Sequence, residues 1–171
     1  MEYKDTTFFK MLKNFKISRI LKSLDFILAL ILTIGFVICA YHYQIIDKLL
    51  TTVSSVYPPI ASGMIAIIIA SLAIIVSMSD SDFIGLLKQI KIYDEILFIF
   101  WYASILAGIS IVIDVVGYIL VSIGATTHIS LILLALSTFF TAYAVFAVIQ
   151  SIGTVMRYGL YRAEFNTGLD G

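Results

Sequence analysis

Residues 26–43 read FILALILTIGFVICAYHY, a stretch with no Lys, Arg, Asp or Glu. A helix that crosses the roughly 30 Å hydrocarbon core of a bilayer needs about 20 mostly apolar residues, and this stretch is close to that length. Ser23 and Asp25 precede it and can cap the exposed N–H groups of a first helical turn. The stretch begins late and no small-residue cleavage site follows it, so it predicts a retained membrane-spanning helix rather than a cleaved signal peptide.

Three further apolar stretches have the length of a membrane span. They cover residues 58–78, 96–123 and 128–156. We place the start of the second at Pro58 and Pro59, because proline suits a first helical turn, where its missing N–H is not needed. The sequence therefore predicts an all-α integral membrane protein with four transmembrane helices within residues 26–156.

The amino-acid composition supports this class. Of 171 residues, 61% are hydrophobic and 13% are charged, whereas ordinary soluble domains have about 45–50% apolar and about 25% charged residues. A soluble globule of this size has too much surface to cover with so few polar residues, so that class is excluded. The single cysteine and the two prolines also exclude a disulfide scaffold and a collagen-like chain.

Basic residues set the expected orientation. Of the 11 Lys and Arg residues, ten fall in segments on one side of a four-span topology and only Lys48 falls on the other. Because cytoplasmic loops of membrane proteins carry an excess of Lys and Arg, both termini are predicted to be cytosolic, in a multi-pass protein of the cell inner (plasma) membrane. The ten are Lys4, Lys10, Lys13, Lys16, Arg19, Lys22, Lys88, Lys91, Arg157 and Arg162.

Three segments outside the spans are assigned to the cytosolic side. Residues 1–25 form a basic, amphipathic arm, the loop 79–95 carries a short amphipathic helix over 82–92, and residues 157–171 form a tail. The basic residues either rest on anionic lipid or form a surface for an anionic ligand such as a nucleotide or oligonucleotide. The candidate ligand- or lipid-binding residues are Lys10, Lys13, Lys16, Arg19, Lys22, Arg157 and Arg162.

Asp114 is the charged residue deepest inside a predicted span, near its midplane. A charged side chain there is costly and is expected to face the bundle, water or a partner. It shares a helical face with Ser110, and the fourth span carries a stripe of hydroxyl and small residues at spacings of four and three. Such a stripe is typical of a pore wall and equally of a helix–helix seam. The candidate pore-lining residues are Ser110, Asp114, Ser137, Thr141 and Ser151.

Aromatic residues follow at the cytosolic end of the fourth span. Tyr158, Tyr161 and Phe165 recur at spacings of three and four. They are candidates for a hydrophobic gate that closes a pore by dewetting when several subunits meet. The alternative is an aromatic belt at the level of the lipid headgroups.

The sequence carries no recognisable enzymatic motif. A catalytic triad, an HExxH motif, a Walker-type loop and a Rossmann fingerprint are all lacking, so we expect neither enzymatic activity nor a cofactor. His42 and His128 lie at the ends of spans one and four, but no third ligand is in view, so no metal site is expected. Cys39, inside the first span, is interpreted as a packing residue.

A chain with four spans and little soluble mass favours a channel subunit, a small transporter or an adaptor. A lone four-helix bundle has little room for an aqueous path, so conduction is expected to need several copies around an axis. A closed homo-oligomer such as a tetramer or pentamer is therefore predicted. The alternatives are a small proton-coupled transporter that uses Asp114 and a non-conducting membrane adaptor.

The layout of a basic cytosolic N-terminus, four spans and aromatics from Tyr158 to Phe165 resembles the small membrane channel effectors of prokaryotic antiphage defence, including the Hailong type. In that type, a channel subunit is paired with a nucleotidyltransferase. The resemblance covers the architecture of the whole chain. It implies a homo-oligomeric ion channel that a nucleotide-derived ligand controls and whose opening depolarises the cell, and it assigns no individual residue.

Overall fold

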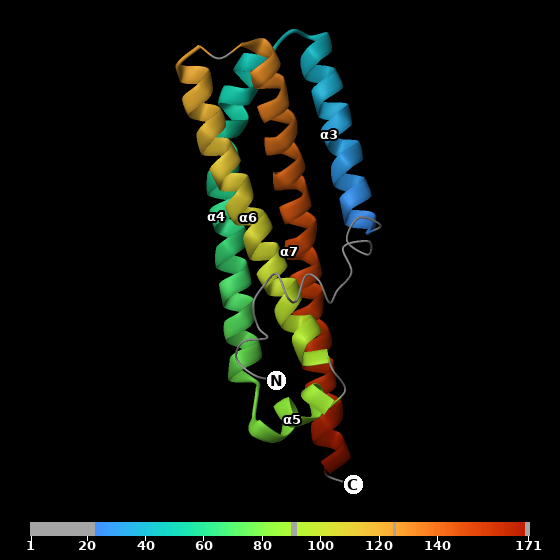
Figure 1. Cartoon of the computed structure of the whole chain (residues 1–171). Coiled ribbons are helices and arrows are strands. Elements are labelled where there is room, and N and C mark those ends of the chain that lie inside the picture. The colour runs from blue at the N-terminus through green and yellow to red at the C-terminus, as the bar shows by residue number, and fades with distance from the viewer. Residues whose placement is uncertain (1–22, 90–91, 125, 170–171) are drawn as a thin grey trace.

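The described part of the molecule is a bundle of helices. The computed structural model describes residues 23–89, 92–124 and 126–169, and its four long helices run up and down in alternation (Figure 1). All four are long and apolar enough to cross a membrane, which confirms the predicted all-α, four-span architecture. The helices are α3 (Leu24–His42), α4 (Ile46–Ser77), α5 (Ser81–Gln89), α6 (Ile92–Ser122) and α7 (Thr127–Leu169).

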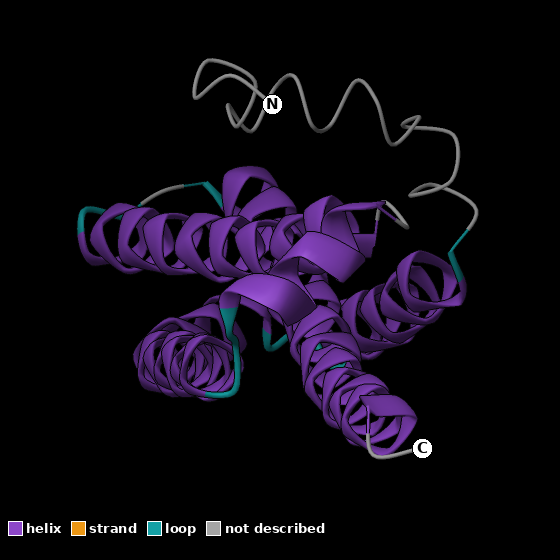
Figure 2. Cartoon of the chain, turned by 90° about the horizontal axis from the view of Figure 1, so that it is seen from below, coloured by secondary structure: helices purple, strands orange, loops and turns teal. Residues whose placement is uncertain are grey.

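The bundle has two distinct ends. Short turns join α3 to α4 and α6 to α7 at one end, which we call the turn end, and the opposite end, called the α5 end, carries α5 and the last part of α7 (Figure 1). Helices α6 and α7 pack on each other and on α4, whereas α3 contacts mainly α7. Seen from the α5 end, the loop residues of the described part lie between helices or directly before α3 (Figure 2).

The local sequence explains where α3 begins and ends. The Ser23 side chain accepts a hydrogen bond from the Phe26 N–H at 3.2 Å, as expected for a capping residue. After α3 the chain reverses through Gln44, whose φ of 53° lies in the left-handed region. A residue other than glycine adopts this conformation at a cost of roughly 1–2 kcal/mol. The reversal lets Ile46 begin α4 after a short turn.

The prediction that Pro58 and Pro59 occupy a first helical turn is wrong. Helix α4 begins at Ile46, and both prolines lie inside it. A proline inside a helix removes an N–H donor and costs about 3 kcal/mol or more, but the preceding turns are held by tertiary packing. Ile46, Leu50 and Val53 are buried at helical spacing, so their apolar face extends the helix well before the prolines.

The helices at the α5 end also differ from their predicted limits. Helix α5 is the short helix expected in the 79–95 loop, but it ends at Gln89, and α6 already begins at Ile92. Helix α7 continues to Leu169, so most of the predicted tail extends the last helix. Aromatic side chains of this extension pack on Phe83 of α5, which gives the last turns a partner. Residues 1–22 of the predicted arm lie outside the described residues.

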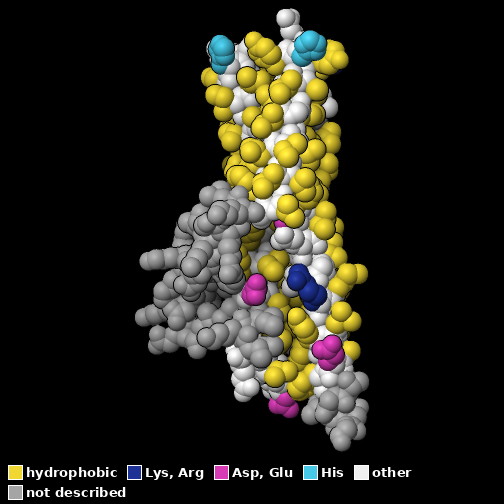
Figure 3. Space-filling model, turned by 90° about the vertical axis from the view of Figure 1, so that its right-hand side faces the viewer, with side chains coloured by type: hydrophobic (Ala, Val, Ile, Leu, Met, Phe, Trp, Pro, Cys, Tyr) yellow, Lys and Arg dark blue, Asp and Glu magenta, His cyan; other side chains and the backbone are white. Residues whose placement is uncertain are grey.

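The surface distribution of side chains suits a membrane-spanning bundle. On the face shown in Figure 3, apolar side chains cover the part towards the turn end, histidines mark that end, and the charged side chains lie towards the α5 end. Helix α3 is the least covered of the four spans, and its exposed Leu and Ile side chains are those that a bilayer would cover. The orientation of the termini towards the cytosol stays a prediction.

Candidate functional site

Asp114 lies in the interior of the bundle. Its side chain is fully buried. It stands eight residues before the end of α6 at Ser122, which corresponds to about 12 Å along a helix. This depth is close to the middle of a hydrocarbon core of about 30 Å. The carboxylate therefore faces protein rather than lipid at a depth where an unpartnered charge is most costly.

Serine hydroxyls hold the Asp114 carboxylate between two helices. Ser137 of α7 donates to Oδ1, and Ser110, one turn earlier in α6, donates to Oδ2 at 3.3 Å. Thr141 Oγ1 lies 2.6 Å from the Ser110 hydroxyl and can donate to it. All four side chains are buried. We call these four residues the Asp114 cluster, because their hydrogen bonds connect them and offset the cost of burying polar groups.

A close approach of α4 and α6 adjoins this cluster at Gly117. Gly117 lies about one turn beyond Asp114, on the same face of α6. A Cβ atom added to it would stand 3.1 Å from Ser54 Oγ and 3.4 Å from Leu50 Cδ1. Glycine therefore lets the two helices come closer here than a larger residue would, as small residues do in other membrane helix contacts.

The structure places every predicted pore-lining residue in the interior of one subunit. Four of the five are fully buried, and Thr141 is 6% exposed. Ser151 stands apart from the Asp114 cluster, because its hydroxyl donates to the Val148 carbonyl of its own helix at 2.7 Å. Within one subunit, the stripe on α7 thus faces inward as a seam. Lining of an axis shared by several subunits stays a prediction.

Sequence reasoning missed three hydroxyls that lie near the cluster or towards the turn end. The Ser54, Ser130 and Thr138 hydroxyls are buried and have no hydrogen-bond partner among the described residues. Ser130 precedes Ser137 by seven residues, so it continues the stripe on α7. That spacing could have identified it. Neither Ser54 nor Thr138 stands out in the sequence, because hydroxyl residues are common on both of their helices.

A tyrosine pair lies on the α5 side of the cluster. The Tyr102 hydroxyl of α6 donates to the Tyr143 hydroxyl of α7 at 2.6 Å, and Phe26 of α3 meets the Tyr143 ring edge to face at 5.7 Å between centroids. Beside the start of α3, the Gln150 amide donates to the Asp25 carboxylate. These contacts fasten α3 to α7 and show which level of α7 corresponds to the beginning of the first span.

The predicted gate residues are divided between two places. The Tyr158 hydroxyl lies 2.5 Å from Ser79 Oγ, and its ring meets Phe83 edge to face at 5.2 Å between centroids. Phe165 also packs on Phe83. Tyr161 is 40% exposed and is not part of this contact, although it lines a pocket between α6 and α7 together with Tyr158. The three side chains do not form one ring within a subunit, and closure of a shared pore by them stays a prediction.

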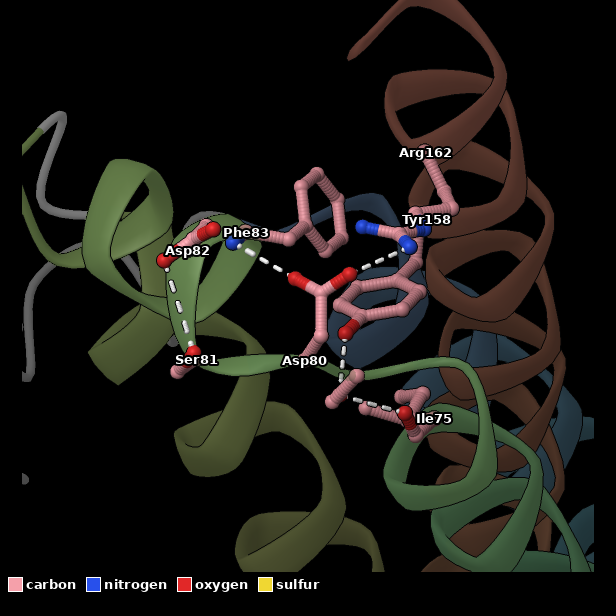
Figure 4. Close-up of polar contacts among 8 residues, drawn as sticks. Ile75, Asp80, Ser81, Asp82, Phe83, Tyr158 and Arg162 are labelled. Carbon is pink, nitrogen blue, oxygen red and sulfur yellow. Dashed lines mark hydrogen bonds and ion pairs between the residues drawn. The ribbon is translucent and has the colours of Figure 1, made fainter. Parts of the chain in front are cut away.

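Arg162 and Asp80 tie α7 to the start of α5. Arg162 Nη2 lies 2.5 Å from Asp80 Oδ2, and its guanidinium stands over the Phe83 ring at 5.1 Å. Asp80 Oδ1 also accepts the Phe83 N–H at 2.8 Å and so caps α5 (Figure 4). The hydrogen bond from Arg162, followed by that from the Phe83 N–H, holds the pKa of Asp80 below its ordinary value. We call Ser79, Asp80, Phe83, Tyr158 and Arg162 the α5 clasp.

Of the predicted ligand- or lipid-binding residues, Arg157 and Arg162 are described, and the five on the arm lie outside the described residues. Arg162 is held in the α5 clasp, whereas Arg157 lines the pocket between α6 and α7. At the turn end, His42 and Asp47 line a second pocket of about 630 Å³. Over the described ranges, no three potential metal-ligating side chains come together.

Comparison with known proteins returned no matching family model, no matching curated protein and no matching solved structure. The resemblance to antiphage channel effectors therefore rests on architecture alone. Architecture does not imply function, which has to be inferred from specific sites. Here that site is the Asp114 cluster.

Proposed function

We propose that the protein is a small proton-coupled membrane transporter in which Asp114 carries the proton. The observation behind this proposal is a fully buried carboxylate near the middle of the spans, whose hydrogen-bond partners in the described residues are serine hydroxyls. Ionisable side chains at such depth are rare in membrane proteins and mark proton relays and ion or substrate pathways.

Hydroxyl partners suit a carboxyl group that changes its protonation state. When Asp114 is charged, its two oxygens accept hydrogen bonds from Ser137 and Ser110. When it is neutral, the added proton can be donated to a serine oxygen, because a hydroxyl both donates and accepts. A Lys or Arg partner would favour the charged form alone. The cluster can therefore satisfy both states without a change in helix packing.

Polar groups on both sides of the cluster offer a route for the proton. On the α5 side, Thr141 of the cluster is followed along α7 by Tyr143, which is hydrogen-bonded to Tyr102 of α6. Buried hydroxyls of Ser54 and Thr138 supply further donors and acceptors on α4 and α7. Pumps and transporters carry protons along chains of Asp, Glu and His side chains, and we infer that hydroxyl groups take that part here.

Proton flux into proteoliposomes under an imposed membrane potential tests this proposal. We expect flux in the wild type and its loss in Asp114→Asn, because the amide keeps the shape and can still bond to both serines but cannot take up a proton. Asp47→Asn is the matched control, since Asp47 is exposed at the turn end. Equal flux in wild type and Asp114→Asn, with both variants intact by size-exclusion chromatography, would exclude Asp114 as the proton carrier.

A second candidate is the homo-oligomeric ion channel, and α4 provides the observation that favours it. This helix presents small and hydroxyl side chains in an exposed row at spacings of three and four. The hydroxyls of the row donate to carbonyls of their own helix, so the row can face water or a neighbouring subunit. We infer that four or five copies would meet along it. The row is Thr52, Ser55, Pro59, Ser62, Ala66, Ala70, Ala73 and Ser77.

Ser62→Leu tests the channel and leaves the transporter untouched. Ser62 is exposed and its hydroxyl donates to the carbonyl four residues earlier at 2.8 Å. Ser122 shares both properties on α6 and is the matched control. In a channel lined by α4, Ser62→Leu suppresses ion flux, added nucleotide-type ligand opens the wild type, and Ser122→Leu behaves like the wild type. A monomer by native mass spectrometry, or unchanged flux in Ser62→Leu, excludes this channel.

A further inference from the structure

A pocket at the α5 end lies between α6 and α7, away from the Asp114 cluster. It encloses about 140 Å³, and Tyr158 of the α5 clasp forms part of its wall. The pocket combines two charged residues, three hydroxyl-bearing residues and an apolar edge. The other lining residues are Glu95, Ile96 and Ile99 from α6, and Thr154, Arg157 and Tyr161 from α7.

The two charged residues of the pocket come from the two different helices that line it. Glu95 belongs to α6 and Arg157 to α7, and both are exposed. Arg157 makes a long hydrogen bond from Nε to the Gly153 carbonyl at 3.4 Å. In the described part of the chain, its terminal nitrogens and the Glu95 carboxylate have no partner. The pocket therefore offers a cation and an anion that no other residue of the described ranges neutralises.

The pocket lies close to the outer edge of the lipid headgroup layer. The Gln150–Asp25 hydrogen bond marks the level at which the α3 span begins. Arg157 lies seven residues further along α7, which is about 10 Å at 1.5 Å per residue. The polar layers extend roughly 5–8 Å beyond the hydrocarbon core on each side, so the Arg157 backbone stands just outside them and its long side chain can reach back to the phosphate groups. Ile99 lies one turn nearer to the core than Glu95, so the apolar edge points towards the acyl chains.

We propose that this pocket binds a phosphoethanolamine group, with the phosphate on Arg157 and the primary ammonium on Glu95. A guanidinium presents several donors in a fork that matches phosphate oxygens, and a carboxylate forms strong hydrogen bonds with an ammonium group. A simple anion is repelled by Glu95, and a simple cation is repelled by Arg157. A zwitterion pairs with both residues.

The volume of the pocket and the hydrogen-bonding chemistry of Glu95 further restrict which ligands can bind. A volume of about 140 Å³ is well below the roughly 300–1,000 Å³ of pockets that enclose whole drug-sized molecules, so a nucleotide does not fit inside. A choline group has no N–H to donate, and its methyl groups hold the nitrogen away from Glu95. The pocket therefore distinguishes ethanolamine from choline. The group can belong to phosphatidylethanolamine or to free ethanolamine phosphate.

Native mass spectrometry of the full chain, purified in detergent, tests the proposal on the wild type alone. The protein is mixed with equal amounts of phosphatidylethanolamine, phosphatidylcholine and phosphatidylglycerol that share the same acyl chains. We expect about tenfold greater retention of phosphatidylethanolamine than of phosphatidylcholine, which is the effect of one charge-assisted hydrogen bond. If excess ethanolamine phosphate displaces the bound lipid, the free compound is sufficient for binding to the pocket. If the lipid stays bound, the pocket takes its phosphoethanolamine group from phosphatidylethanolamine. Equal retention of the ethanolamine and choline lipids overturns the proposal.

Substitutions assign the two charges separately. Glu95→Gln is expected to lower retention of phosphatidylethanolamine to the level of phosphatidylcholine and to raise retention of phosphatidylglycerol, because the carboxylate that repels this anionic lipid is removed. Arg157→Gln is expected to lower retention of all three lipids, because each carries the phosphate. Asp82→Asn and Lys88→Gln are matched controls, since they remove the same charges from exposed residues of α5, outside the pocket. Wild-type retention in both pocket variants, or an equal loss in the controls, overturns the proposal.

Discussion

Replacing Ser137 with alanine removes one of the two hydroxyl donors to Asp114. Ser137 is fully buried, so solvent does not take its place and one carboxylate oxygen loses its donor. Hydrogen bonds to charged groups contribute about 1.5–3 kcal/mol in soluble proteins, whereas those between membrane helices average about 0.6 and reach about 1.7 kcal/mol. Because the acceptor is a buried carboxylate, we expect Ser137→Ala to lower the free energy of unfolding by about 1–2 kcal/mol.

Ser151→Ala is the matched control for this prediction. Ser151 is also a fully buried serine of α7, but its hydroxyl donates to a carbonyl of its own helix. Alanine has the better helix propensity, so we expect a change of at most about 0.5 kcal/mol. Reversible unfolding in mixed micelles, followed by circular dichroism, measures both variants. If the two lose the same stability, the inter-helix bond to Asp114 does not stabilise the bundle and the reasoning is refuted.

Two further perturbations test the α5 clasp and the contact of α4 with α6. Because hydrogen bonds lower the pKa of Asp80, their contribution is present above the ordinary carboxyl pKa of about 3.9 and is lost as the pH falls through the lowered value. The hydrogen-exchange rate of the α5 amides, corrected for its intrinsic pH dependence, should therefore increase only at acidic pH in the wild type. In Asp80→Asn the rate should already be high at neutral pH. Identical pH profiles for the two proteins would contradict this prediction. Gly117→Ala should destabilise by about 1–3 kcal/mol, since its Cβ would meet Ser54 Oγ at 3.1 Å. Gly108→Ala should not destabilise the protein, because open space surrounds Gly108. Equal melting temperatures of the two variants would count against a close contact between α4 and α6 at Gly117.

Hydropathy predicted the four spans because length and composition alone decide whether a helix can cross a bilayer. It misplaced the start of α4, where Asp47, Lys48 and several hydroxyl residues interrupt the apolar pattern. Packing between helices makes that segment helical. Leu50 and Ser54 face Gly117 of α6, and this contact cannot be predicted from the local sequence. The same limit applies to the last helix, which continues beyond the predicted span to Leu169.

Helical periodicity placed Ser110 with Asp114 on one face and Ser137 with Thr141 on another, but periodicity does not say what a face meets. A seam within one chain and the lining of a shared axis have the same pattern. Contacts between distant residues were not predicted at all. Arg162 and Asp80 are 82 residues apart in the chain, and their pairing depends on how far α7 extends beyond α4 at the α5 end.

Titration of Asp114 itself is the most direct measurement of whether this residue carries protons. Infrared difference spectroscopy of the reconstituted full chain detects a protonated carboxyl group through its carbonyl band. We predict a band that appears and disappears reversibly with pH in the wild type and in Asp47→Asn, and that is missing in Asp114→Asn. If the wild type and Asp114→Asn give the same difference spectra over the pH range in which transport occurs, Asp114 keeps one protonation state and serves only to join α6 to α7.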